Sequence, residues 1–373
     1  MKDFASMDDI LEKFTHIRLA TEEDNEEILE FYNNESMQTG EESISFARTP
    51  DFFNFYKLSS KKYWLFIFLN KDQSIGGVGG VLRHERFVNG KLKPLAYFCD
   101  LRISNSASRI AKVQWRKFFP EIINILPKLG PDEYCESAYT AILADNEAAI
   151  NSLTKGGRGI TYRFLGKYHV HSYINTGFLK SKKFYAQDIS QDEFLRFYKT
   201  ENSEKFLCED PIQTIKEISK YSTPVSFVGV YHQGKIIAAL RPVLKNQTRR
   251  IKIQNMSKSK VMATNGLKLL GRPTPSKQGE LSILDLSFLS YSSHLELEDK
   301  KLVLEAIQLW IERNKLLKDI HIINMTDTSD IIPSSPLERG INFVTPGHLY
   351  EIHPEEQSGI LPTSQFRFEG AFL

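Results

Sequence analysis

The chain has 373 residues, with 48 Lys and Arg against 46 Asp and Glu, and a net charge of +2. This length is too great for one typical domain and suits two. An apolar fraction of 41% excludes a wholly disordered chain, and the balanced charge points to no polyanionic partner for the chain as a whole. No run approaches the roughly 18 apolar residues of a membrane span, so we expect no membrane partner.

The N-terminal segment and the cysteines bear on location. Residues 1–14 are acidic and contain no apolar run, unlike a signal peptide. The three cysteines, Cys99, Cys135 and Cys208, are not spaced as metal ligands, and so few cysteines fit a reducing compartment. We expect a cytoplasmic protein without a metal.

The first half alternates strands and helices. Residues 17–20 are an expected strand, and Thr21 followed by Asp24 predicts an N-cap for the next helix. Asn89-Gly90 predicts a hairpin turn. The remaining expected elements are a helix at 51–58, strands at 63–69, 75–82 and 139–144, a helix ending at 153, and a β–β pair of 160–166 with 168–171.

One strand–loop–helix unit organises this half. An apolar strand at 96–104 stops at a polar loop, 105–112, and a helix follows from about Val113. The first N–H groups of a helix have no intrahelical acceptor, so this junction predicts an anion site beyond the end of the strand.

The second half repeats the order of the first. Four matched segments support this, at offsets of 161 to 185: Glu27–Tyr32 with Glu193–Tyr198, Ile75 with Ile236, Asp100–Ile103 with Asp285–Phe288, and Gly159 and Gly166 with Gly340 and Gly347. We therefore predict two similar α/β modules, 1–183 and 184–373.

The second module carries about 24 extra residues between Leu240 and Asp285. In the same region, residues 245–279 hold nine Lys and Arg and no Asp or Glu. Such a basic insert could bind an anionic partner, or it could be a solvated extended hairpin. It lacks the regular aromatic interleaving of a nucleic-acid platform, so we predict no nucleic-acid partner.

The element order, with Ile17–Asp24 at the start and Asp145–Ile150 before the last helix, resembles the GCN5-related N-acetyltransferase (GNAT) superfamily. The resemblance is clearer over 15–175 than over 184–353. It implies two tandem GNAT-like modules, each a mixed, mostly antiparallel sheet flanked by helices. It also implies transfer of an acyl group from acetyl-CoA, or another acyl-CoA, to an amine of a small molecule or peptide.

The resemblance also implies a donor site. The backbone of Leu101 and Ile103 would hold the pantetheine, and Asn146 matches the family's asparagine. The diphosphate would lie on the run Ser108, Arg109, Ile110, Ala111 and Lys112. This run departs from the family pattern, since Ser108 replaces Gln or Arg and Arg109 replaces a glycine. The family's tyrosine position holds Leu153.

Two carboxylates are candidates for the general base that the family reaction uses, Asp100 and Glu136. Either could instead be a structural carboxylate at a strand end. The second module departs further from the pattern, because the loop 290–299 has no glycine and carries three acids. Asp330 stands at the position of Asn146, and Pro333 and Pro336 disturb the last helix. We expect it not to bind CoA.

Three alternatives stay open. The chain could be an inactive GNAT-like scaffold that binds a ligand or partner, or it could resemble the aminoacyl-tRNA-dependent ligases built on the same double fold, which only the basic insert favours. His169 and His171 share one strand face and could contact a metal or acceptor, or be an ordinary core pair. The aromatic tail, 366–373, is expected to pack as a last strand.

Overall fold

The structure is a computed structural model, and it describes residues 4–34, 38–39, 42–48, 50–155, 159–174, 183–202, 207–209, 212, 216, 225–244, 250–253, 262, 265–266, 268–269, 280–317, 319–328, 342–363 and 366–367. The first half contains α1 (Asp8–Leu11), β1 (Ile17–Leu19), α2 (Asn25–Asn34), β2 (Gln38–Thr39), β3 (Glu42–Ala47), α3 (Phe53–Ser59), β4 (Tyr63–Leu69), β5 (Ile75–Val88), β6 (Lys91–Ile103), α4 (Arg109–Ile125), β7 (Ser137–Leu143), α5 (Glu147–Thr154) and β8 (Ile160–Ile174).

The second half repeats much of this order. Its elements are β9 (Tyr185–Ile189), α6 (Gln191–Asn202), β10 (Leu207–Glu209), β11 (Phe227–His232), β12 (Lys235–Leu244), β13 (Arg250–Ile253), β14 (Glu280–Leu281), β15 (Ile283–Tyr291), α9 (Leu297–Arg313), β16 (Ile322–Asp327) and β17 (Asn342–Pro354). Within the described ranges, no helix combines the length and apolarity needed to span a lipid bilayer.

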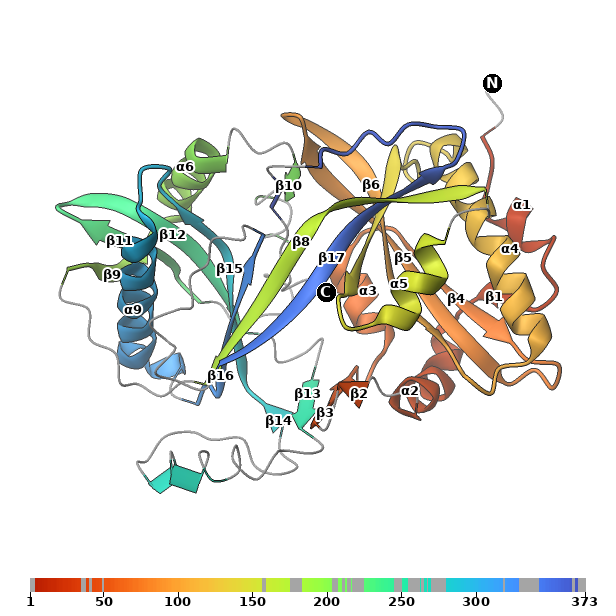
Figure 1. Ribbon diagram of the computed structural model, residues 1–373, viewed down its shortest axis with the longest axis horizontal. Helices are drawn as coiled ribbons and strands as arrows, with labels where there is room; N and C mark the ends of the chain where they lie inside the picture. The colour runs from red at the N-terminus through yellow and green to blue at the C-terminus, as the bar shows by residue number, and fades with distance from the viewer. Residues whose placement is uncertain are drawn as a thin grey trace.

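One large sheet runs through both halves (Figure 1). Its strand order is β1-β4-β5-β6-β7-β17-β8-β16-β15-β12-β11-β9, with β10 added beside β5. Strand β17, from the end of the chain, therefore lies between β7 and β8 of the first half. Strand β8 in turn lies beside β16 of the second half, so each half completes its sheet with a strand of the other. A smaller sheet, β14-β13-β3-β2, also joins the halves.

The central β8–β17 pair is symmetric. Gly166 is paired with Leu349, and Gly347 is paired with Tyr168. An offset of 181 residues relates Gly166 to Gly347 and Tyr168 to Leu349, so the two pairs are equivalent. A Cβ on Gly347 would lie 2.0 Å from the Tyr168 ring, and a Cβ on Gly166 would lie 2.3 Å from the Phe366 ring. Each glycine therefore leaves room for an aromatic ring on the sheet surface.

Helices cover both faces of the sheet, and the core divides between them. Beside α2 and α3 one buried cluster includes Ile28, Tyr56 and Tyr97. The opposite face packs on α4 through side chains such as Phe118. In the second half α9 covers one face and α6 the other. The predicted mixed α/β fold, with a mostly antiparallel sheet flanked by helices, is confirmed.

Most local predictions in the first half hold, but several bounds are corrected, since β5 continues to Val88 and β6 begins at Lys91. Thr21 and Asp24 form the predicted capping box, and Asn89 and Gly90 both adopt the positive φ of a tight hairpin turn. However, residues 160–174 form one continuous strand rather than a β–β pair, because β17 and β16 pair with it along its length. The helix after the organising strand begins at Arg109, four residues earlier than expected, because Ser108 caps it.

Several predicted features lie wholly or partly outside the described residues. Only parts of the basic insert 245–279 are described, and of these β13 pairs with β3. Asp330, Pro333 and Pro336 fall outside the described residues, as do 368–373 of the tail. The tail's Phe366 is described and is buried in the first-half core.

Candidate active site beside the end of the β6–β7 pairing

Strands β6 and β7 stop pairing before either of them ends. Their parallel register runs from Leu95–Ser137 to Phe98–Thr140, while β6 continues to Ile103 and β7 to Leu143. Burial changes at the same point. Residues 95–98 of β6 are buried, whereas 99–101 are only partly buried. Beyond Phe98, no described strand pairs with the edge of β6 that faces β7, so backbone groups there are open to other partners.

A β-bulge shapes this exposed edge. Between Val78 and Gly80 of β5, the pairing with β6 shifts register, and Asp100 adopts a φ of +52°. The Asp100 side chain is only 7% exposed, although the residue as a whole is only partly buried. The bulge therefore directs the side chain of Asp100 into the protein and leaves the rest of the residue partly exposed.

A short loop leads from β6 to the start of α4. Ser108 is the N-cap, with its Oγ accepting from the Ala111 N–H at 3.4 Å, and its own N–H donates to Oδ1 of Asn70 at 2.8 Å. The N–H groups of Arg109 and Ile110 lie in the first turn, where a helix offers no internal acceptor. Arg109 is exposed, and the Lys112 ammonium donates to the Asn105 carbonyl at 2.8 Å. This end of the helix is suited to an anion.

The Asp100 carboxylate lies in a buried polar cluster. It accepts hydrogen bonds from Tyr56 Oη at 2.7 Å and Tyr32 Oη at 3.1 Å, and it forms an ion pair with Arg48 at 2.8 Å. The Arg48 guanidinium also lies 3.7 Å from the centre of the Phe55 ring. Arg102 stacks on Tyr32 at 3.4 Å and donates to the Tyr32 carbonyl. Asp100 and Arg102 of β6 are therefore surrounded by groups from the earlier segment 32–56.

Gly80 makes the Tyr56 contact feasible. A Cβ at this position would lie 2.3 Å from Tyr56 Oη and 2.5 Å from its ring. Real Cβ atoms do not approach so closely, so only glycine lets the Tyr56 ring lie flat on β5 and reach Asp100.

The cluster moves the pKa values of its groups away from neutrality. Burial raises the pKa of Asp100, but the Arg48 charge and the Tyr56 hydroxyl outweigh burial and bring it below the ordinary value of 3.8. Burial raises the pKa of Tyr56 well above 10.0 and that of Cys99 well above 9.0. Near neutral pH, Asp100 is therefore ionised, and the phenol and the thiol keep their protons.

Glu136 lies at the other end of the strands. Its N–H donates to the Pro94 carbonyl, and its carboxylate forms an ion pair with Lys93. Pro94 precedes Asp100 by six residues along β6, which corresponds to about 20 Å. The structure therefore does not bring Glu136 and Asp100 together.

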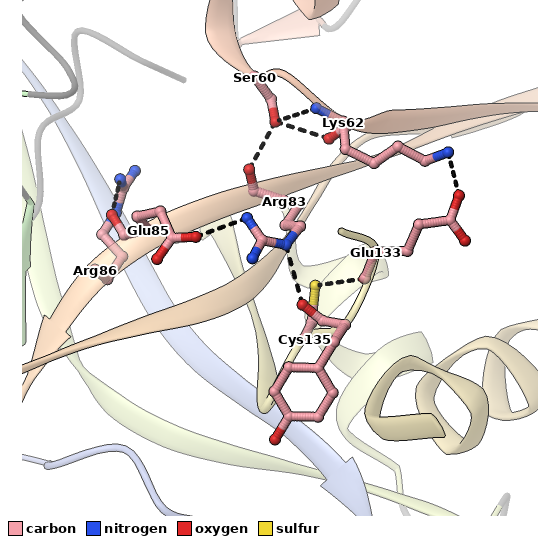
Figure 2. Close-up of polar contacts among 8 residues, drawn as sticks. Ser60, Lys62, Arg83, Glu85, Arg86, Glu133 and Cys135 are labelled. Atoms are coloured by element: carbon pink, nitrogen blue, oxygen red, sulfur yellow. Dashed lines mark hydrogen bonds and ion pairs between the residues drawn. The ribbon is translucent and has the colours of Figure 1, made fainter. Parts of the chain in front are cut away.

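The loop before Glu136 is tied to the sheet (Figure 2). Arg83 of β5 donates to the Tyr134 carbonyl at 3.1 Å and to Glu85 at 2.7 Å, and Ser60 Oγ donates to the Arg83 carbonyl at 2.6 Å. Lys62 forms an ion pair with Glu133 in the same network. These contacts give this end of the sheet a structural role.

Asn146 caps a helix. Its Oδ1 accepts from the Ala149 N–H at 3.0 Å, at the N-terminus of α5. Ala111 is buried at 1% exposure, so its side chain lies inside the protein and only its backbone is available at the helix start. Leu101 and Ile103 are partly buried on the stretch of β6 that lies beyond its pairing with β7.

The second half has a matching bulge, but with different chemistry. The β12–β15 pairing shifts between Ala239 and Arg241, and Phe288 adopts a φ of +56°. The residue equivalent to Asp100 is therefore Phe288, at an offset of 188, and the predicted match of Asp100 with Asp285 is wrong. Sequence similarity favoured Asp285 because it shares Asp-Leu, whereas the bulge fixes the true register. Phe288 is fully buried against Phe194 and Tyr198, so no carboxylate occupies this position.

Two other predictions concern the second half and the histidine pair. Glu296, Glu298 and Asp299 lie at the start of α9, as the sequence indicated. The rings of His169 and His171 are 6.2 Å apart, and His171 is buried at 9% exposure. Among the described residues, no group of three or more His, Cys, Asp or Glu is placed to hold a metal.

Sequence reasoning missed Arg48, Tyr32 and Tyr56 as partners of Asp100. It also missed Gly80, which makes room for the Tyr56 ring. A signal for Tyr56 existed, because the helix 51–58 is rich in aromatic residues. Arg48 had no such signal, since it follows β3 and meets Asp100 only through the fold.

The fold has a GNAT-like architecture. Solved structures with this fold include Saccharomyces cerevisiae N-myristoyltransferase with bound myristoyl-CoA, at a TM-score of 0.57 and 9% identity, covering 95% of this chain and 85% of that one. The same yeast enzyme with myristoyl-CoA and inhibitors gives a TM-score of 0.54 at 11% identity, covering 95% and 87%.

A third similar structure is a fungal multi-domain GH3 β-N-acetylglucosaminidase that contains a GCN5-related glucosamine N-acetyltransferase region. Its TM-score is 0.55 at 11% identity, and the match covers 90% of this chain and 38% of that chain. The sequence matches no protein-family model and no curated protein. At such low identities the likeness establishes the fold alone.

Proposed function

We propose that this chain is an acyl-CoA-dependent N-acyltransferase, most simply an acetyltransferase, with its site in the first half. One observation carries the proposal: the β6–β7 pairing ends beside a bulge, and the same strand leads directly to the exposed start of α4. The likeness to a yeast N-myristoyltransferase solved with myristoyl-CoA supports an acyl-CoA donor.

The donor would follow the course of the backbone. Its diphosphate would lie on the N–H groups and charges of residues 108–112, with Asn146 as the neighbouring cap. The pantetheine would hydrogen-bond to the unpaired backbone of Leu101 and Ile103. The acyl group would then reach the bulge at Asp100, where an amine of a small molecule or peptide would attack the thioester.

Asp100 serves in this proposal as a positioning residue. A carboxylate whose pKa is lowered is a poor acceptor for the proton of an amine at neutral pH. Its bonds to Arg48, Tyr56 and Tyr32 hold the bulge, which in turn aims the backbone at the donor. Glu136, on its placement, would act outside the site. Four further points remain proposals. They are the division into 1–183 and 184–373, a donor site confined to the first half, a cytoplasmic location and an anionic partner for the basic insert.

The test is calorimetric titration with CoA and acetyl-CoA. Arg109→Glu places a negative charge on the exposed first turn of α4, so we expect at least a tenfold rise in Kd, or about 1.4 kcal/mol. Arg116→Glu is the matched control, because Arg116 is exposed on the same helix about 10 Å further along. It should change the Kd less than twofold. Absence of CoA binding at millimolar concentration in the wild-type protein would refute the proposal.

A second candidate is an acyl-CoA-binding protein without catalysis. It is favoured by the pKa shifts of Asp100, Tyr56 and Cys99, which leave none of these three able to exchange a proton near neutrality. Release of free thiol from acetyl-CoA in the presence of an amine panel separates the two candidates. Turnover above the protein-free rate indicates the enzyme, and tight donor binding without turnover indicates the binding protein.

A further inference from the structure

Aromatic rings fill the sheet surface just before the point where β6 and β7 separate. Tyr97 and Tyr139 are paired on the two strands, and their rings stack at 5.0 Å between centres with an interplanar angle of 29°. The His84 ring stacks on the other side of Tyr97, at 5.8 Å and 18°. All three residues are buried, at 4%, 4% and 7% exposure.

Hydrogen bonds lock this stack. Tyr139 Oη lies 3.1 Å from His84 Nδ1, and the Arg86 guanidinium donates to the same nitrogen at 3.0 Å. A ring nitrogen that accepts from a guanidinium carries no proton, so His84 is neutral. The stack is therefore held from both β5 and β7 and cannot move aside without breaking buried hydrogen bonds.

The opposite face of the sheet is closed at the same level. Phe98 is 7% exposed and meets Phe119 of α4 edge to face, with 4.8 Å between ring centres. The Thr140 hydroxyl donates to the Phe98 carbonyl at 2.9 Å, across the last pair of the two strands. Close packing of this kind leaves few voids larger than a water molecule.

The direction of the donor brings its acyl group to this barrier. Residues 108–112 follow Ile103, so a donor anchored there runs backward along β6, toward Cys99 and Phe98. The acyl chain is its leading end, and rings block continuation on either face. Resting on the proposed function, we propose that Tyr97, Phe98 and Tyr139 form an aromatic floor that limits the donor to a short acyl group, such as acetyl, propionyl or butyryl.

The test compares acyl-CoA donors of different chain length on the wild-type protein. A chain that enters an apolar pocket gains affinity about fourfold for each buried methylene. We expect octanoyl-CoA to bind no more tightly than acetyl-CoA, because its chain finds no pocket. Octanoyl-CoA binding more than tenfold tighter than acetyl-CoA overturns the aromatic floor while leaving the proposed function intact. Failure of CoA itself to bind refutes the proposed function instead.

A pair of variants identifies the residue that sets the limit. Tyr139→Ala removes one ring of the floor, and we expect the ratio of octanoyl-CoA to acetyl-CoA affinity to rise at least tenfold. Tyr139→Phe keeps the ring and removes only the hydroxyl, so it should retain the wild-type ratio. A folded Tyr139→Ala protein, checked by circular dichroism, with an unchanged ratio would contradict the role of Tyr139. If this variant does not fold, the chain-length series on the wild-type protein decides.

Discussion

Asp100 shows how one residue combines strain with charge. Its positive φ is uncommon for a residue with a side chain, and such a conformation persists only where surrounding contacts hold it. Those contacts are the ion pair with Arg48 and the hydroxyls of Tyr32 and Tyr56. Removing one member of a buried ion pair leaves the other charge without compensation, which is costly.

Arg48→Ala should therefore lower the free energy of unfolding by about 3–5 kcal/mol at pH 7. The wild-type pair stabilises the protein above the unfolded pKa of Asp100, and this contribution is lost as the pH falls through the lowered folded value. In the variant, burial still raises the pKa of Asp100 but the Arg48 charge no longer opposes it, so the pKa is higher than in the wild type although Tyr56 and Arg102 still lower it. Acid then protonates the carboxyl and relieves the penalty. Urea unfolding at pH 7 and pH 4 should show the deficit shrinking in acid.

Arg18→Ala is the control for this experiment. Its partner is Asp24, at 2.7 Å, but the Arg18 side chain is 42% exposed. An exposed pair contributes only about 0–1 kcal/mol, so the loss should be small. A loss for Arg48→Ala no larger than this would show that the buried cluster does not hold the bulge.

At the scale of elements, β17 depends on one buried carboxylate. Glu351 is fully buried and accepts from the Ser137 hydroxyl at 2.9 Å and from the N–H groups of Ile360 and Leu361 at 2.8 and 3.1 Å. Arg163 of β8 completes the set as an ion pair. Glu351 thus ties β17 to β7, to β8 and to the segment that follows it.

Glu351→Ala should lower the free energy of unfolding by about 3 kcal/mol, since each buried donor left without an acceptor costs about 1–3 kcal/mol. Chemical denaturation measures the change. Glu356→Ala is the comparison, because Glu356 is an exposed carboxylate in the same segment and should shift stability by less than about 0.5 kcal/mol. Equal effects of the two substitutions would argue against the role assigned to Glu351.

At the scale of the molecule, the described strands join the two halves in four places, one of which is the pairing of β8 with β16. The β17 strand inserts between β7 and β8, β10 extends the sheet beside β5, and β13 pairs with β3. A sheet built in this way exposes unpaired edges if either half opens alone. The halves should therefore unfold together, although each has its own buried cores.

The three tryptophans allow this to be measured. Trp64 and Trp115 lie in the first half and Trp310 in the second. We expect the fluorescence transitions of Trp310→Phe and of the double variant Trp64→Phe/Trp115→Phe to have coincident urea midpoints, after correction for the stability of each protein. Midpoints of the two variants that still differ after this correction would indicate that the halves unfold independently.

The sequence alone determined the features that depend on near neighbours. The capping box of Thr21 and Asp24, the Asn89-Gly90 turn, the strand–loop–helix unit around residues 96–112 and the GNAT-like element order all arise from contacts within a few residues or from local hydrophobic patterns. These patterns sufficed for the fold class, while the donor site that they indicate stays a prediction.

Only the tertiary structure decided the partners that lie far apart in the chain. Arg48 reaches Asp100 from 52 residues away, Glu351 reaches Arg163 from 188 away, and Phe288 rather than Asp285 takes the position of Asp100. Hydrophobic periodicity reports which face of a strand is buried, but a strand has two edges and its pattern does not name the neighbour on either. Register, bulges and the exchange of β8 and β17 are set by packing across the whole sheet.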